Sequence, residues 1–230
     1  MGLASIGCLS RLAPLAIAAL LFSCATAPPR GPDQTPPARA TKDPGIVALR
    51  AKLTEGARSV LGKKELVVRG KRFSYDCTGT VLAIYWYAGI DLGRDLGRFS
   101  GNGVTRLYKT LERENLLYSA TTPLSGDIIF WDNTYDADGN GAWDDPLTHV
   151  GMVMSVDDDG TVAYIHQHVR NGIAIEHMNL RSPDVQRRLE MGRMKILNSP
   201  LRLARKGTPH PPNWLAGQLY RTLGMGYLFE

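Results

Sequence analysis

The sequence predicts an α+β fold, in which N-terminal helices pack on an antiparallel sheet. Apolar residues recur at helical spacing over residues 44–62 and 104–117, both in the first half of the chain. After residue 125, short apolar runs alternate with turn residues, which is the pattern of strands joined by hairpins. The 230-residue chain is long enough for one well-buried domain, which we place at residues 44–230.

Three helices are expected in the first half of this domain. The first begins at Pro44, because Asp43 can cap it and proline suits the first helical position. The second follows Asp76, another capping residue, carries Cys77 in its first turn and ends at Gly89. The other segments predicted here are a helix over 104–117, a short strand over 65–68, a turn over 69–71 and a glycine-rich loop over 91–103.

The second half of the domain is expected to form the sheet. Its strands are predicted at 126–131, 148–156, 161–169, 173–180 and 194–203, with hairpin turns at 157–160 and at Asn171-Gly172. Two further segments, residues 182–191 and 213–223, are predicted to be helical.

The first 23 residues are predicted to be a signal peptide. An apolar run over residues 12–22 follows Arg11 and is too short to span a bilayer comfortably. It leads into Leu21-Phe22-Ser23-Cys24, which resembles a bacterial lipobox, although Phe22 is not the usual small residue. The resemblance implies that Cys24 becomes the lipidated first residue of the mature protein. The alternative is an ordinary secretory signal with an incidental cysteine.

Residues 24–43 are rich in proline, alanine and threonine, and they are predicted to form an extended tether without a fold of its own. Such a tether holds the domain away from the membrane surface. Ala25 stands where aspartate is the usual retention signal, which implies sorting to the periplasmic side of the outer membrane in a cell that has one. The expected product is a monomer that is lipid-anchored in the cell envelope.

The chain has a formal net charge of +5, and the charges are scattered along the sequence. No basic stripe resembles a nucleic-acid footprint, so we expect no nucleic-acid partner. Weak attraction to an anionic envelope polymer is the alternative to an ordinary solvated surface.

Cys77 is the candidate nucleophile. If Cys24 is acylated and Cys8 is removed with the signal peptide, Cys77 is the single free thiol of the mature protein. A thiol in the first turn of a helix faces the positive end of the helix dipole, which favours the reactive thiolate. The alternative is a small buried thiol in the core.

Histidines on the predicted strands provide candidate bases. His149 lies at the start of one strand, and His166 and His168 share one face of the next. Pairing these strands around residues 157–160 puts His149 opposite about residue 168, so either histidine can lie beside it. A thiol at a helix N-terminus, a histidine base and a polar residue that orients the base form the arrangement of a thiol nucleophile.

Three motifs that occur in order resemble the NlpC/P60 and CHAP families of bacterial cell-wall hydrolases. They are Asp76-Cys77-Thr78-Gly79, the strand that begins Ser125-Gly126-Asp127, and Thr148-His149-Val150-Gly151. The resemblance spans about residues 70–180 and implies a papain-like α+β core. The sequence departs from the family pattern at Thr78, where serine is usual.

The resemblance implies a role for each residue. Cys77 is the expected nucleophile, His149 the general base and then the acid, and His166 the residue that orients His149, with His168 as the alternative for this last role. The backbone N–H of Cys77 is the expected oxyanion donor. The second oxyanion donor is left open between Tyr75 and Ser74. No cofactor is required for this chemistry.

An acidic segment, residues 132–147, separates the Gly-Asp strand from His149. Its oxygen-bearing side chains alternate and are followed by Gly141, which reproduces the first half of a calcium loop. Leu147 stands where that loop has its closing glutamate. The predicted ligands of a structural Ca²⁺ are Asp136, Asp138, Asn140 and Asp144, with Asp145 as the alternative to Asp144. A polar turn loop without an ion is the competing interpretation.

Two functions of different classes follow from the sequence. The first is an envelope-anchored cysteine hydrolase that cleaves amide bonds in peptidoglycan stem peptides, as an endopeptidase or an amidase. The second is a catalytically silent wall-binding or scaffold lipoprotein on the same fold, whose mark is an unreactive Cys77 with a normal or raised pKa. The resemblance also leaves an acyltransferase open.

Overall fold

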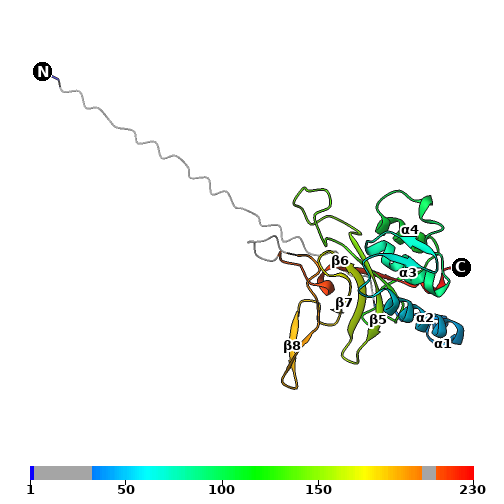
Figure 1. The fold of residues 1–230 in the computed structure, drawn as a ribbon. Helices are drawn as coiled ribbons and strands as arrows, with labels where there is room; N and C mark the ends of the chain where they lie inside the picture. Colours follow the sequence, from blue (N-terminus) through cyan, green and yellow to red (C-terminus); the bar gives the residue numbers. More distant parts are fainter. Residues whose placement is uncertain (3–32, 204–210) are drawn as a thin grey trace.

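The computed structural model describes residues 1–2, 33–203 and 211–230. Its centre is a six-stranded antiparallel sheet of order β3-β10-β4-β5-β6-β7. Figure 1 labels three of these strands, β5, β6 and β7. The strands are β3 (Leu117–Tyr118), β4 (Ile128–Trp131), β5 (His149–Val156), β6 (Thr161–His168), β7 (Gly172–Asn179) and β10 (Tyr220–Gly224). This architecture confirms the predicted α+β class.

Helices α2 (Pro44–Val60) and α3 (Cys77–Ala88) pack on each other, and α3 also contacts β5 and β6. Both helices begin where the sequence predicted, because Asp43 caps α2 and Asp76 caps α3 through their carboxylates. The other elements are α1 (Ala38–Lys42), β1 (Leu66–Val68), β2 (Lys71–Phe73), η1 (Leu96–Arg98), α4 (Gly103–Arg113), β8 (Arg187–Glu190), β9 (Arg193–Ile196), α5 (Ala216–Leu219) and η2 (Gly226–Leu228).

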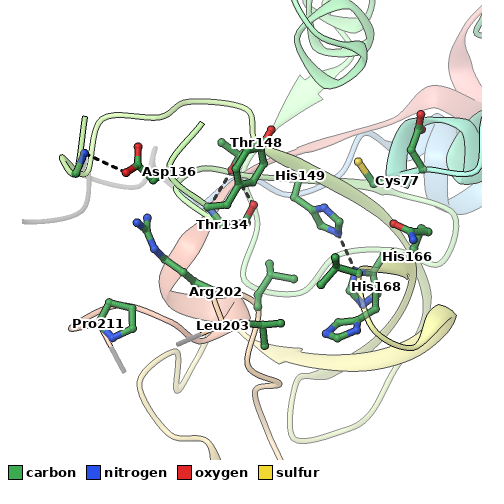
Figure 2. A pocket seen from close by; sticks show the side chains of 16 residues that line it. Cys77, Thr134, Asp136, Thr148, His149, His166, His168, Arg202, Leu203 and Pro211 are labelled. Carbon is green, nitrogen blue, oxygen red and sulfur yellow. Dashed lines mark hydrogen bonds between the residues drawn. The ribbon is translucent and has the colours of Figure 1, made fainter. Parts of the chain in front are cut away.

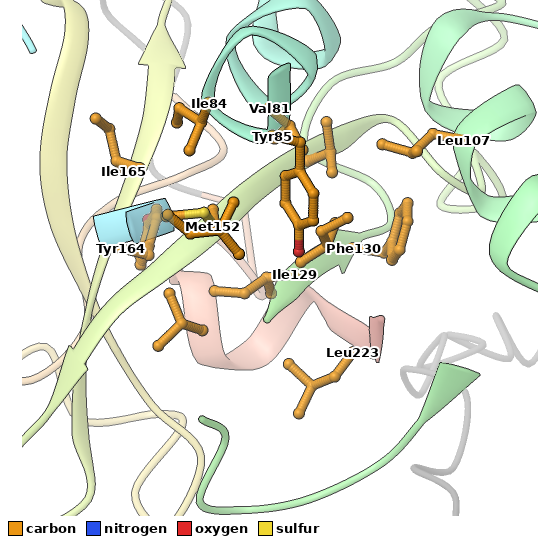
Figure 3. Close-up of a cluster of buried hydrophobic side chains, with 14 of the residues drawn as sticks. Val81, Ile84, Tyr85, Leu107, Ile129, Phe130, Met152, Tyr164, Ile165 and Leu223 are labelled. Atoms are coloured by element: carbon orange, nitrogen blue, oxygen red, sulfur yellow. The ribbon is translucent and has the colours of Figure 1, made fainter. Parts of the chain in front are cut away.

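Helix α3 is enclosed by the core (Figure 3). Val81, Ile84 and Tyr85 of this helix are fully buried. The hydroxyl of Tyr85 donates a hydrogen bond of 2.6 Å to the carbonyl oxygen of Gly126, directly before the Gly-Asp strand. Burial on this scale holds the N-terminus of α3, and with it Cys77, in a fixed position relative to the sheet.

The predicted helix over residues 182–191 is wrong. β8 pairs there with β9 in a hairpin, and the connecting residues Met191 and Gly192 both have positive φ. A two-residue turn with two positive φ angles matches the twist of a β-hairpin, and glycine favours it. The turn signal therefore outweighs the helical spacing. The predicted strand over 194–203 is correct only for its first residues, since β9 ends at Ile196.

The predicted helix over residues 213–223 is wrong for most of its length. Only α5 is helical, and the chain then continues as β10 between β3 and β4. An inner strand gains ladder hydrogen bonds on both sides, which outweighs a weak helical pattern. The predicted helix over 104–117 ends early, at Arg113, and Asn115 has a φ of 54°.

Part of the predicted tether is folded. Residues 38–42 form α1, Ala40 is fully buried, and the carboxylate of Asp33 accepts hydrogen bonds from the backbone N–H and hydroxyl of Thr121. The prediction of an extended segment is therefore wrong for this part, because its contacts with the domain stabilise it. The apolar run over 12–22 and Cys24 lie outside the described residues. Within the part that is described, no helix has the length and apolar character needed to cross a membrane.

Candidate active site

Cys77 is the first residue of α3 and is partly exposed. The Asp76 carboxylate accepts the Gly79 N–H at 2.7 Å, and the Asp76 carbonyl accepts the Thr80 N–H at 3.0 Å. Residue 79 has to be glycine, since a Cβ there would lie 2.0 Å from the carbonyl oxygen of Ser74. Within the described ranges, no acceptor is bonded to the backbone N–H of Cys77. This N–H can therefore bind an anion.

His149 is the first residue of β5, and its Nε2 lies 2.8 Å from Nδ1 of His166 on β6. Because Nε2 is engaged, Nδ1 is the ring nitrogen that is available to Cys77. Figure 2 shows the Cys77 sulfur pointing toward the His149 ring. The ring of Trp131 packs beside His149, with 5.8 Å between centroids. The structure thus brings the three predicted side chains together from α3, β5 and β6.

The strand register explains why His166 and not His168 bonds to His149. Met152 pairs with Ile165, and continuing this register places His149 opposite residue 168 and diagonal to His166. Nδ1 of His168 instead accepts the backbone N–H groups of residues 170 and 171, each at 3.1 Å. His168 therefore stabilises the turn between β6 and β7.

Glu176 on β7 extends the line of side chains, and the sequence analysis missed it. Its Oε2 lies 3.3 Å from Nε2 of the fully buried His166. Ala174 pairs with His166 across the strands, and its small side chain leaves room for Glu176 to reach the ring. The alternation of side chains along β7 could have indicated which residues share a face with Glu176. Whether that face is also the face of His166 depends on the register between β6 and β7. β7 begins at Gly172, so the turn lies over residues 169–171 and not at Asn171-Gly172.

Burial raises the pKa of the Cys77 thiol, and the neighbouring Asp76 carboxylate adds to this effect. The backbone N–H of Val150 and hydrogen bonds from Thr78 oppose it, without reversing the direction. The position of Cys77 in the sequence predicts that the helix dipole favours the thiolate. The structure differs because desolvation of the buried thiol, and then the charge of Asp76, disfavour the thiolate.

Burial also lowers the pKa of His149 well below its ordinary value, with the charges of His166 and His168 acting in the same direction. At neutral pH the two reactive groups are therefore a neutral thiol and a neutral imidazole. Such a pair is activated when the base removes the thiol proton during attack.

The reactive side chains line a cleft of about 780 Å³, which lies within the size range of ligand sites (Figure 2). One wall comes from the acidic segment and includes Tyr135, Asp136 and Gly141. Leu201 and Arg202 line it as well. Neither Tyr75 nor Ser74 lines this cleft, and the Tyr75 hydroxyl donates to the carbonyl oxygen of Lys63 at 2.8 Å.

The structure places the predicted calcium ligands in two groups. Asp136 and Asp138 lie with Asp145, and one carboxylate oxygen of each is within 4.8 Å of the others. Asp144 is exposed outside this group. The side-chain NH₂ of Asn140 donates to Asp138 at 2.8 Å and points toward Asp144 at 3.4 Å. Of the two alternatives, Asp145 and not Asp144 lies with Asp136 and Asp138.

Comparison with known proteins gives one family. Residues 68–168 match the family model described as the CHAP domain. The chain is also similar to the crystal structure of an NlpC/P60 family protein from Bacillus cereus ATCC 10987, with 20% sequence identity and a TM-score of 0.35. This similarity covers 76% of the present chain and 39% of that chain. A comparison with curated proteins finds no match.

Proposed function

We propose that the chain, whose residues 68–168 match the family model of the CHAP domain, is an envelope-anchored cysteine hydrolase of peptidoglycan stem peptides. Domains of these families are typically peptidoglycan hydrolases that act as cysteine peptidases or amidases. The observation that carries the proposal is the line from Cys77 through His149 to His166 along one cleft.

The reaction follows from this line. Sγ of Cys77 attacks the carbonyl carbon of an amide while its proton passes to Nδ1 of His149. The backbone N–H of Cys77 binds the oxyanion that forms. His149 returns the proton to the leaving amine as the C–N bond breaks and a thioester remains. A water molecule, deprotonated by His149, hydrolyses the thioester, which releases a carboxylic acid and restores the thiol.

The hydrogen bond between the rings of His149 and His166 selects the tautomer of each histidine. Nδ1 of His149 can accept a proton only when the hydrogen of the neutral ring is on Nε2, which then donates to Nδ1 of His166. His166 in turn carries its hydrogen on Nε2, which lies next to the Glu176 carboxylate. His166 and Glu176 are therefore positioning residues that hold the base in its reactive form.

Arg202 supports a peptide substrate that carries carboxylates, as stem peptides do. Its guanidinium lies 4.0 Å from the centre of the Trp143 ring, and one of its nitrogens donates to the carbonyl oxygen of Asn133 at 2.9 Å. These contacts hold a positive charge at the edge of the cleft, where it can pair with a substrate carboxylate.

The decisive experiment incubates the full chain with purified peptidoglycan beside its Cys77→Ala variant, and identifies the released fragments by mass spectrometry. We expect new peptide ends with the intact protein and none with the variant, which should unfold at the same temperature. Release that does not require Cys77 would contradict the proposal. The fragments also identify the bond and so separate an endopeptidase from an amidase.

The anchor is proposed from the sequence of residues 1–43. We propose a signal peptide that is removed before Cys24, lipidation of Cys24, and residence as a monomer on the periplasmic side of the outer membrane. Tritiated palmitate should label the chain in bacterial cells, and a Cys24→Ala variant should remain unlabelled. Equal labelling of both forms would contradict lipidation at this residue.

A second function is favoured by one observation, the raised pKa of Cys77. A catalytically silent wall-binding module on the same fold needs no reactive thiol. The rate of alkylation by iodoacetamide as a function of pH separates the two. A hydrolase whose base activates its thiol should lose reactivity when His149 is replaced by glutamine. A silent module should show the same slow alkylation with or without that histidine.

A further inference from the structure

Asp145 is a buried carboxylate with one unsatisfied oxygen. The residue is 6% exposed, and its Oδ1 accepts the backbone N–H of Ala137 at 3.0 Å. Over residues 33–203 and 211–230, nothing donates a hydrogen bond to its Oδ2. A buried charged oxygen without a partner is costly, so this position favours a cation that the carboxylate can bind.

Two further carboxylates lie beside that of Asp145. Asp136 and Asp138 each place a carboxylate oxygen within 4.8 Å of the others and of Asp145. In the described part of the chain, no lysine, arginine or histidine forms an ion pair with any of the three. Three like charges at this separation repel one another unless a cation lies between them.

We propose that Asp136, Asp138 and Asp145 bind a structural Ca²⁺. Carboxylate oxygens are hard ligands, and the spacing of the first two with Gly141 is that of a calcium loop up to its sixth position. Gly141 has a φ of 78°, a conformation that glycine adopts without strain. The carbonyl of the next residue stands at the seventh position, which supplies a backbone ligand in such loops.

The position of Asp145 explains how this loop closes without the usual glutamate. Its backbone N–H donates to the side chain of Asn133 at 2.9 Å, and its carbonyl accepts the N–H of Asn133 at 2.8 Å. These bonds fix the residue against the end of β4. Leu147, at the usual closing position, instead donates its N–H to Asp132 at 2.7 Å. The loop therefore returns to the sheet two residues earlier than a full calcium loop.

The ion would fix one wall of the cleft and would not take part in the chemistry. Asp136 and Gly141 line the cleft, and the hydroxyl of Thr148, directly before His149, accepts the backbone N–H of Thr134 at 2.9 Å. Figure 2 shows Asp136, Thr134 and Thr148 along this wall. The site does not depend on the proposed hydrolase activity, because a wall-binding module with the same loop would hold the same ion.

Terbium luminescence tests the site on the full chain. Trp143 belongs to the same loop and can sensitise Tb³⁺ bound beside it. We expect saturable emission that Ca²⁺ at about 1 mM displaces, as for calcium sites of extracellular modules. Asp145→Asn should weaken Tb³⁺ and Ca²⁺ binding at least about tenfold, since it removes one of three charged ligands. Asp144→Asn is the matched control and should bind as the intact protein does.

Two results would overturn the proposal. One is the absence of saturable, calcium-displaced emission from the intact protein. The other is unchanged binding in Asp145→Asn, which would place the ion elsewhere. Asp138→Asn, at an exposed position, serves as a second variant if Asp145→Asn does not fold, and circular dichroism checks the fold of each. We also expect Ca²⁺ to raise the unfolding temperature of the intact protein and of Asp144→Asn.

Discussion

Two groups of polar side chains lie at or beside the central sheet, and they differ in how fully their hydrogen bonds are satisfied. Asp127, directly before β4, is completely buried. Its carboxylate accepts hydrogen bonds from the hydroxyl of Tyr118, from the hydroxyl of Tyr227 at 2.9 Å and from the backbone N–H of Leu124 at 2.6 Å. This Asp127 cluster ties β3 and η2 to β4 and keeps no polar atom for a ligand.

The line of Cys77, His149, His166 and Glu176 has the opposite character. It opens onto the cleft, and among the described residues neither Nδ1 of His149 nor the backbone N–H of Cys77 has a bonded partner. A site that binds a substrate has to keep such atoms available. The two groups therefore divide the polar residues of the domain into those that stabilise the fold and those that can react.

The comparison shows what a sequence motif does and does not reveal. Asp127 belongs to one of the three motifs that resemble the CHAP family, as Cys77 and His149 do. Its burial and its three donors give it a structural role, whereas the other two residues face the cleft. Residues of one motif set can therefore have structural or reactive roles. Their exposure and their hydrogen bonds, and not the motif, distinguish the two roles.

The largest expected effect comes from His149→Gln. The variant loses the general base, so kcat on peptidoglycan should fall about 10³- to 10⁴-fold. The free energy of unfolding should change by less than about 1 kcal/mol, because His149 is the first residue of β5 and is partly exposed where it lines the cleft. Kinetics and urea unfolding of the same preparation measure both. A large loss of stability with little loss of kcat would show that His149 stabilises the fold and does not act in catalysis.

Asp127→Ala should give the opposite result. It leaves two buried hydroxyls and one part-buried N–H without their acceptor, and we expect the free energy of unfolding to fall by about 3–4 kcal/mol. The kcat of the molecules that remain folded should stay close to that of the intact protein, because Asp127 does not line the cleft. Urea unfolding, with kinetics at a temperature where the variant is folded, tests both. A stable variant with low kcat would show that the cluster acts in catalysis.

Local signals predicted the parts of the site that lie close together in the sequence. The cap at Asp76, the thiol and Gly79 are within four residues, so helical start signals place Cys77. The turn over 157–160 joins neighbouring strands and sets their register, which brings His149 beside His166. Short-range geometry was sufficient for both.

Longer-range contacts set the parts that the sequence did not reveal. Glu176 reaches His166 through a register that depends on where one turn begins. β10 is a strand because β3 and β4, from much earlier in the chain, provide its hydrogen-bonding partners. Asp145 is buried through its bonds to Asn133. Propensity and periodicity act over a few residues and carry no information about such partners.

The contribution of Asp127 to stability depends on pH. Burial raises the pKa of Asp127 to about 6, while its hydrogen-bond donors oppose the shift. The pKa of Asp127 is higher in the folded state than in the unfolded state. Its contribution to the free energy of unfolding is therefore fully present below the unfolded pKa and is lost as the pH rises through about 6. Between about pH 4 and pH 7 this contribution should fall by about 3 kcal/mol. The free energy of unfolding of Asp127→Asn, measured in urea over the same pH range, should not show this fall. If the two proteins differ by the same free energy of unfolding at every pH, the prediction is contradicted.

The smallest expected effect comes from Glu176→Gln, which keeps the shape of the side chain and removes its charge next to His166. Burial opposes ionisation of Glu176, yet the contact and charge of His166 lower its pKa, so the carboxylate is charged at neutral pH. Without this charge the base is less well oriented, and kcat should fall about tenfold with little change in stability. His149 also becomes less basic, because a negative charge near the line is lost. The acid limb of the pH profile of kcat/KM should therefore move to lower pH.

Tyr164→Phe is the control, since the hydroxyl of Tyr164 contacts Glu176 at 3.4 Å but carries no charge. This variant should leave the acid limb in place. If the acid limb of the kcat/KM profile does not move in Glu176→Gln, Glu176 only packs against His166 and takes no part in orienting the base.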